Sequence, residues 1–235
     1  MTDEIPPPVQ ARKYRHPNVE ARALAGAVRT EGKGYVLYEY PDYETYRRVQ
    51  TSGNRAKLHW QSVKESHIVL LADWLERTVG PVCFGLCHGT RRGAEQAWFR
   101  QHLSGDPEVI GTEISDTATD FPHTVQWDFH DENPDWAGRA DFVYSNSWDH
   151  AFAPRRAFEA WFAALRPGGV LLLDHSKLQG PRTANELDPF GITFDGLEAL
   201  LGETFAGRGT LLPALDFRET NPDYKTRVVI LRKSA

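Results

Sequence analysis

Residues 82–95 read Val82-Cys83-Phe84-Gly85-Leu86-Cys87-His88-Gly89-Thr90-Arg91-Arg92-Gly93-Ala94-Glu95, an apolar run that passes through glycines four residues apart into a helical pattern. Glycine lets the backbone approach a ligand closely, and the N–H groups at the start of a helix suit a carboxylate or phosphate. A tight turn with close helix packing would use the same residues. The segment therefore predicts a strand, a turn and a helix, and it makes the turn a candidate ligand site.

The chain beyond Gly80-Pro81 continues in the same style, with short apolar runs separated by helical segments. We expect strands at residues 82–87, 109–114, 124–127, 141–144 and 169–173, with helices at 94–103 and 155–165. A helix at 194–201 and two runs at 211–217 and 226–231 complete the chain, the last pair without a helix between them. This alternation is typical of an α/β fold with a parallel sheet, closed here by an antiparallel last strand.

An acidic residue follows the second predicted strand, where doubly wound folds bind a ribose. Glu113 stands 20 residues beyond Gly93, the spacing at which such folds place a carboxylate that accepts hydrogen bonds from ribose hydroxyls. Without the glycine loop, Glu113 would be interpreted as an exposed charge at a strand end. The loop and the acid together favour a nucleoside-containing ligand.

The segment Leu165-Arg166-Pro167-Gly168-Gly169 resembles the helix-turn-strand element of class I S-adenosylmethionine-dependent methyltransferases. In this element Pro167 is expected to end a helix and the two glycines to make the turn. The resemblance covers residues 80–235 and implies a Rossmann-like, mostly parallel seven-stranded sheet flanked by helices, with S-adenosylmethionine as cofactor. Two positions depart from the family's glycine motif: Cys87 stands at the acidic position, and Arg91 replaces the second glycine.

The resemblance also implies which residues hold the cofactor. Glu113 would bind the ribose, and Asp128 would accept from the adenine amino group with Phe129 beside the base; Asp128 as the cap of a turn is the alternative. The implied cofactor residues are His88, Gly89, Thr90, Gly93, Glu113, Ile114, Asp128, Phe129, Asn146 and Ser147. Because Cys87 cannot supply the usual carboxylate, the amino-acid end of the cofactor needs another partner, from backbone carbonyls or the N-terminal helices.

Residues 1–79 are predicted to form an N-terminal arm and a helical lid or substrate segment. Pro6, Pro7 and Pro8 exclude a regular helix in the arm, which extends to about Asn18, whereas residues 42–77 have helical periodicity. Gln50, Asn54 and Lys57 fall on one helical face, where Lys57 could reach the cofactor carboxylate; a solvated helix face is the alternative. Tyr46 and Trp148 are candidates for the pocket wall, although aromatic residues at such spacing are also typical of a core.

Candidate proton acceptors follow the fourth and fifth predicted strands. A hydroxyl acceptor of the methyl group needs a base, and histidine suits this task near neutral pH. His150, with Asp149 to orient its ring, is the first candidate and His175 the second. Asp149, Asp174 and His175 could instead hold a divalent cation, as in the catechol-type O-methyltransferases that resemble this core, but we expect no metal.

Composition narrows the partners of this 235-residue chain. A net charge of -5 without a basic run does not predict nucleic-acid binding, and two cysteines are too few for a disulfide framework. No run is long and apolar enough for a membrane helix, so we expect a cytoplasmic enzyme with a small-molecule acceptor, alone or as a homo-oligomer. Methyl transfer to oxygen is the leading hypothesis, and the alternatives are transfer to nitrogen, a non-catalytic cofactor-binding protein and a nicotinamide oxidoreductase.

Overall fold

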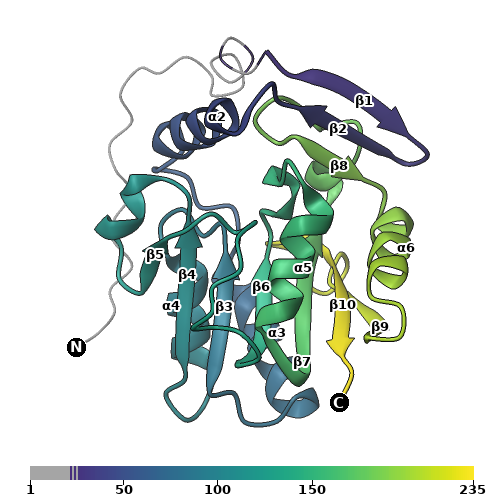
Figure 1. Ribbon diagram of the computed structural model, residues 1–235. Coiled ribbons are helices and arrows are strands. Elements are labelled where there is room, and N and C mark those ends of the chain that lie inside the picture. Colours follow the sequence, from purple (N-terminus) through teal and green to yellow (C-terminus); the bar gives the residue numbers. More distant parts are fainter. Residues whose placement is uncertain (1–21, 23, 25) are drawn as a thin grey trace.

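The computed structural model describes residues 22, 24 and 26–235, so the predicted arm at residues 1–18 lies outside the described part. A central sheet with helices on both faces forms the body of the molecule, and α2 (Tyr43–Ala56) and a small second sheet lie beyond the carboxyl ends of its parallel strands (Figure 1). No helix of the described residues is long and apolar enough to cross a bilayer.

The central sheet has seven strands in the order β5-β4-β3-β6-β7-β10-β9. In chain order they are β3 (Phe84–His88), β4 (Glu108–Glu113), β5 (Thr124–Gln126), β6 (Ala140–Ser145), β7 (Leu165–His175), β9 (Gly209–Asp216) and β10 (Arg227–Lys233). The first five pair in parallel, whereas β10 lies between β7 and β9 and is antiparallel to both. The predicted sheet with its antiparallel last strand is confirmed, and β9 forms the edge.

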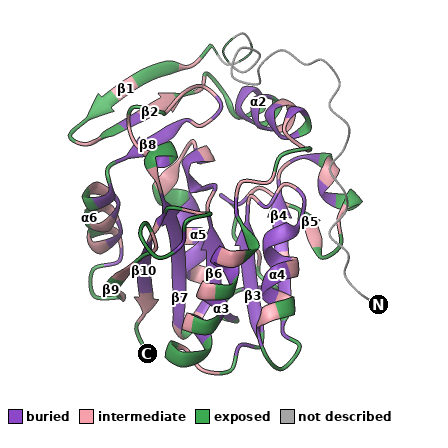
Figure 2. Ribbon diagram, turned by 180° about the vertical axis from the view of Figure 1, so that it is seen from behind, coloured by how far each residue is buried: buried purple, intermediate pink, exposed green. Residues whose placement is uncertain are grey.

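Alternate side chains of the strands pack against helices on opposite faces of the sheet. On β10, Val228 and Ile230 join the apolar cluster that α3 (Glu65–Thr78) and α4 (Ala94–His102) cover. Val229 and Leu231 join the cluster under α5 (Pro154–Ala164) and α6 (Phe194–Thr204). Both faces of the inner strands are buried (Figure 2), which explains why their sequences are nearly continuous apolar runs. The 3-10 turns are η1 (Asp116–Asp120), η2 (Trp148–His150) and η3 (Lys177–Gln179).

The turn before β7 differs from its prediction. α5 ends at Ala164, so Pro167 does not end the helix, and β7 already begins at Leu165 in extended conformation. The pairing with β6 shifts register between Ala140 and Phe142 to accommodate this segment. A Cβ at Gly169 would lie 2.6 Å from the carbonyl oxygen of Ala140, so the glycine is needed for close strand approach rather than for a turn.

A second sheet, which the sequence analysis missed, connects the N-terminal region to the core. It has the order β1-β2-β8, with β1 (Val28–Gly32), β2 (Tyr35–Glu39) and β8 (Phe190–Ile192) all antiparallel. The chain then enters α2, whose N-cap Asp42 accepts a hydrogen bond from the backbone N–H of Thr45. The pairing of β2 with β8 fixes where α2 begins and holds it over the strand ends. A domain boundary between residues 79 and 80 stays a prediction.

Candidate active site

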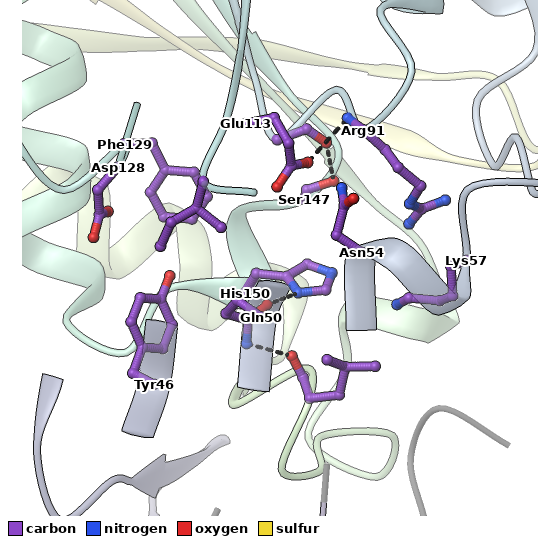
Figure 3. Close-up of a pocket in the computed structure, with 13 residues that line it drawn as sticks. Tyr46, Gln50, Asn54, Lys57, Arg91, Glu113, Asp128, Phe129, Ser147 and His150 are labelled. Atoms are coloured by element: carbon purple, nitrogen blue, oxygen red, sulfur yellow. Dashed lines mark hydrogen bonds between the residues drawn. The ribbon is translucent and has the colours of Figure 1, made fainter. Parts of the chain in front are cut away.

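A cavity lies between α2 and the carboxyl ends of β3, β4 and β6; we call it the strand-end cavity (Figure 3). Its lining residues are Tyr46, Gln50, Asn54, Lys57, Gly89, Arg91, Glu113, Ile114, Asp128, Phe129, Ser147, His150 and Leu187. Its volume is about 40 Å³, enough for little more than water. The structure therefore brings together most of the predicted cofactor residues and the whole predicted polar face of α2.

Gly89 is required both by its conformation and by its neighbour. Its φ is +74°, in the left-handed region, and a Cβ there would lie 2.7 Å from the Cβ of Ser147. The Ser147 hydroxyl in turn donates to the carbonyl oxygen of Gly89 at 3.1 Å. This close approach joins the loop after β3 to the end of β6, and both residues line the strand-end cavity.

Glu113 is held at the end of β4 by backbone N–H groups. Its two carboxylate oxygens accept from Ser115 at 3.2 Å and Arg91 at 3.1 Å. Burial raises the pKa of this carboxyl above its usual value. The Arg91 guanidinium also borders the cavity and donates to the carbonyl oxygen of Trp60 at 2.9 Å. Sequence reasoning treated Arg91 only as a departure from the motif, and missed that its side chain belongs to the site.

Asp128 has hydrogen-bond partners on both carboxylate oxygens. Oδ1 accepts from the backbone N–H of His130 at 3.0 Å and lies 2.7 Å from Nδ1 of the same ring. Oδ2 accepts from the Tyr43 hydroxyl on α2 at 2.9 Å. Although burial raises the pKa of Asp128, these partners hold it below the usual value. Asp128 thus stabilises its own turn and also lines the cavity. The two predicted roles, cap of a turn and acceptor for the adenine amino group, are therefore compatible.

The polar face of α2 is buried against the core, and the alternative of a solvated face is wrong. Gln50 and Asn54 are 5% and 7% exposed, respectively. Gln50 donates to the carbonyl oxygen of Leu187 at 2.9 Å, and Asn54 accepts from the Thr117 hydroxyl at 2.8 Å. Burial lowers the pKa of Lys57, and its Nζ lies 3.8 Å from Asp188. These residues are aimed into the site.

A second, larger cavity of about 500 Å³ adjoins the first; we call it the adjoining cavity. The residues common to both are Lys57, Arg91, Ser147 and His150. Asn146, Asp149, Asp188 and Tyr224 line only the adjoining cavity. Two ligands could therefore meet at the end of β6, one in each cavity.

His150 lies at the junction but is not oriented by Asp149, so that prediction is wrong. Its Nδ1 lies 2.8 Å from Gln50 Oε1, and its Nε2 lies 3.3 Å from an oxygen of Asp188 (Figure 3 shows the Gln50 contact). Burial lowers the pKa of His150 to about 4. Sequence reasoning missed Asp188, because no periodic signal connects a loop before β8 to a turn after β6.

Three predicted site residues lie in the core and line neither cavity. His88 Nδ1 lies 2.8 Å from the Thr112 hydroxyl, and its ring stacks on Trp161. The predicted place of Trp148 in the pocket wall is wrong, because the side chain is completely buried and stacks on His175. His175 Nε2 lies 2.9 Å from the carbonyl oxygen of Ile192, away from His150, a position that does not fit the predicted role of base.

The other predicted residues outside the strand-end cavity have structural contacts. Gly93, with a φ of +75°, is the N-cap of α4, and the backbone N–H of the buried Thr90 donates to the carbonyl oxygen of Thr112 at 3.1 Å. Asn146 donates to the Tyr224 hydroxyl at 3.0 Å.

The three residues considered for a metal do not converge. The Asp174 carboxylate lies 2.9 Å from His67 Nε2 and accepts from the hydroxyls of Tyr144 and Tyr224, at 2.7 and 3.1 Å. These contacts direct it toward α3, whereas His175 packs against Trp148. Within residues 22, 24 and 26–235, no group of three or more His, Cys, Asp or Glu side chains is arranged to hold a metal ion.

Comparison with known proteins gives structural relatives only. No family model and no curated protein sequence matches the chain. Among solved structures, 1,6-didemethyltoxoflavin-N1-methyltransferase of Burkholderia thailandensis, bound to 1,6-didemethyltoxoflavin and S-adenosylhomocysteine, matches with a TM-score of 0.62 and 17% identity. The match covers 90% of this chain and 100% of that one.

Two further structures match less closely. The N-methyltransferase NodS of Bradyrhizobium japonicum WM9 has a TM-score of 0.58 and 14% identity over 79% of this chain and 99% of that one. The [4+2]-cyclase SpnF has a TM-score of 0.53 and 13% identity, and the match covers 71% of this chain and 81% of that one. At these identities the likeness concerns the backbone alone. Together with the strand order, it shows that the chain has the Rossmann-like fold of class I S-adenosylmethionine-dependent methyltransferases.

Proposed function

We propose that this chain transfers a methyl group from S-adenosylmethionine to a small-molecule acceptor. The observation that carries the proposal is that Glu113 and Asp128, from neighbouring strand ends, face one cavity that meets a second beside Ser147. Two carboxylates in the strand-end cavity suit a nucleoside. The adjoining cavity gives an acceptor access to the same end of β6. The fold of the relatives supports this assignment.

The residues of the strand-end cavity fit the cofactor chemically. Glu113 would accept from the ribose hydroxyls and Asp128 from the adenine amino group, with Phe129 beside the base. Cys87 is buried, and burial raises its pKa well above the usual value, so it supplies no charge to replace the family's acid. We assign the methionine carboxylate to Arg91 and Lys57, the two cations that border both cavities.

The small volume of the strand-end cavity supports a movement that makes room for the cofactor. A volume of about 40 Å³ is far too small for a nucleoside, and α2 with Tyr46 and Gln50 forms one wall of the cavity. We therefore propose that α2 is a lid that moves away from the strand ends and closes again over the cofactor. Closure would exclude water and align the acceptor, which is most of what methyl transfer needs, because the sulfonium leaving group is already good.

Oxygen is the acceptor atom that we propose. A hydroxyl loses its proton during transfer, and both an imidazole and a carboxyl, His150 and Asp149, border the adjoining cavity. Nitrogen is the alternative, and the two relatives with the highest TM-scores are an N1-methyltransferase and an N-methyltransferase by name. At 17% identity or less, that likeness does not fix the acceptor atom.

Two measurements test the proposal. Calorimetry should detect binding of S-adenosylhomocysteine, and NADH should not bind. Transfer of labelled methyl groups from S-adenosylmethionine to matched sets of phenols, alcohols and amines, with product masses, should then show oxygen products. Absence of S-adenosylhomocysteine binding would refute the assignment of the fold's usual cofactor. Binding without any methylated product would favour a protein that uses the fold differently, as the cyclase among the relatives does by name.

A further inference from the structure

We propose that Asp149 is the catalytic base that takes the acceptor's proton, and that His150 is a positioning residue. This inference rests on the proposed methyl transfer. The sequence favoured His150 as the base and Asp149 as the residue that orients it. The structure supports the opposite assignment, because the two side chains have different partners.

The Asp149 carboxyl is buried and has no partner from another side chain. It belongs to η2, directly after the strand that ends at the junction, and it is 6% exposed. Among the described residues, no other side chain donates a hydrogen bond to it or pairs with it. Asp149 lines the adjoining cavity and not the strand-end cavity. A buried acidic residue, whose carboxyl accepts from its own backbone N–H and pairs with no other side chain, therefore borders the space assigned to the acceptor.

His150 also lines the adjoining cavity, but a protein oxygen already lies near each of its ring nitrogens. The Gln50 amide donates to the carbonyl oxygen of Leu187, which fixes the direction of its own oxygen toward His150 Nδ1. The other ring nitrogen, Nε2, faces Asp188. Both nitrogens thus meet oxygen atoms of the protein, and the lowered pKa of His150 makes it a weak base at neutral pH. The ring instead joins α2 to the loop before β8.

The titratable and charged groups around Asp149 come from the loop before β8, the C-cap of α2, the loop after β3 and η2 itself. Burial and the neighbouring Asp188 raise the pKa of Asp149 well above its usual value, whereas Lys57 on the C-cap of α2 and Arg91 after β3 lower it. His150, on the same turn, completes the set. When ionised, a carboxyl with a raised pKa is a stronger base than an ordinary aspartate, which suits a general base.

The step balances without any other reactant. The acceptor oxygen forms a bond to the methyl carbon as the carbon–sulfur bond breaks, and that bond's electron pair stays on sulfur. The hydroxyl proton passes to Asp149, which becomes neutral, and then to solvent through the adjoining cavity, where the exposed Trp60 forms part of the rim.

The first experiment needs no known acceptor. S-adenosylmethionine differs from S-adenosylhomocysteine by one methyl group and one positive charge on sulfur. An ionised carboxyl nearby should therefore favour binding of S-adenosylmethionine. We expect the ratio of their affinities to shift toward S-adenosylmethionine between pH 5 and 9 in the wild type and in Asp135→Asn, an exposed control. The dependence of the ratio on pH should be clearly weaker in Asp149→Asn. A flat ratio in the wild type, or an unchanged slope in Asp149→Asn, would overturn the inference.

The second experiment uses an acceptor from the panel above. Asp149→Asn should lower kcat about a hundredfold and remove the acidic limb of the kcat/KM profile, and Asp149→Glu should restore part of both. His150→Gln should lower the rate but keep that limb. If His150→Gln removes the limb while Asp149→Asn keeps it, His150 is the base. Failure of the proposed function would be seen separately, as no binding of S-adenosylhomocysteine to the wild type.

Discussion

The hydroxyl of Tyr43 donates a 2.9 Å hydrogen bond to Asp128, from the first turn of α2 to the turn after β5. The bond occupies the same carboxylate that we assign to the adenine amino group. It attaches α2 to the core at the position assigned to the cofactor, and under that assignment the adenine amino group and the helix would compete for one oxygen atom.

Tyr43→Phe is expected to speed cofactor entry. Loss of a hydrogen bond worth roughly 1 kcal/mol would make opening of α2 easier, so association of S-adenosylhomocysteine should become about fivefold faster. Stopped-flow tryptophan fluorescence would measure the rate. Arg47→Ala, which removes an exposed ion pair with Glu44 on the same helix, is the matched control and should leave the rate unchanged. An unchanged rate in Tyr43→Phe would show that this bond does not limit entry.

Glu113→Gln should weaken cofactor binding strongly. The amide can no longer accept ribose hydroxyls with a full carboxylate charge, and hydrogen bonds to charged groups contribute about 1.5–3 kcal/mol, so the Kd for S-adenosylhomocysteine should rise at least tenfold. Calorimetry gives the Kd, and thermal unfolding checks that the loop held by Glu113 is intact. Asp120→Asn, at an exposed residue of η1, serves as control. A Kd within twofold of the wild type would remove Glu113 from the site.

Glu95 should make the stability of the protein depend on pH. Burial raises its pKa to about 7, and one oxygen has no hydrogen-bond partner among the described residues. Because the folded state favours the neutral acid, the stabilisation is complete below pH 4.5 and is lost as the pH rises through 7. Relative to Glu95→Gln, the wild-type free energy of unfolding should fall by about 3 kcal/mol between pH 4.5 and 8. Urea unfolding at both pH values measures this, with the exposed Glu132→Gln as control.

Asp149→Asn should stabilise the protein at alkaline pH. The raised pKa of Asp149 means that the folded state disfavours its charged form, so the wild type loses stability as the pH rises through the folded pKa. The Tm of the variant should exceed that of the wild type at pH 8.5, and the two should converge near pH 4. A Tm difference that does not change with pH would mean that the carboxyl does not titrate in this range.

The sequence by itself was sufficient for the succession of strands in the central sheet and for much of the lining of the strand-end cavity. Glu113, Asp128 and Gly89 lie at strand ends, and the carboxyl ends of parallel strands meet at one edge of the sheet. Periodicity and spacing were enough for Gly89 and Glu113, whereas Asp128 followed from the family resemblance. The positions of Gln50, Asn54 and Lys57 on one helical face also follow from periodicity alone. Trp148 and His175 are adjacent to the same strand ends, yet nothing local distinguishes a side chain directed into a cavity from one directed into the core.

Only the tertiary structure decided which partners meet across long distances in the chain. Asp188 contacts His150 because β8 pairs with β2 and holds the preceding loop against the end of β6. Such pairing depends on contacts between segments more than a hundred residues apart, and a three-residue strand such as β8 leaves no periodic pattern to reveal it. The sequence therefore determined the central sheet and the edge of it at which the strand-end cavity lies. Packing between distant segments decided that Asp188 takes the place beside His150 and that Asp149 borders the adjoining cavity.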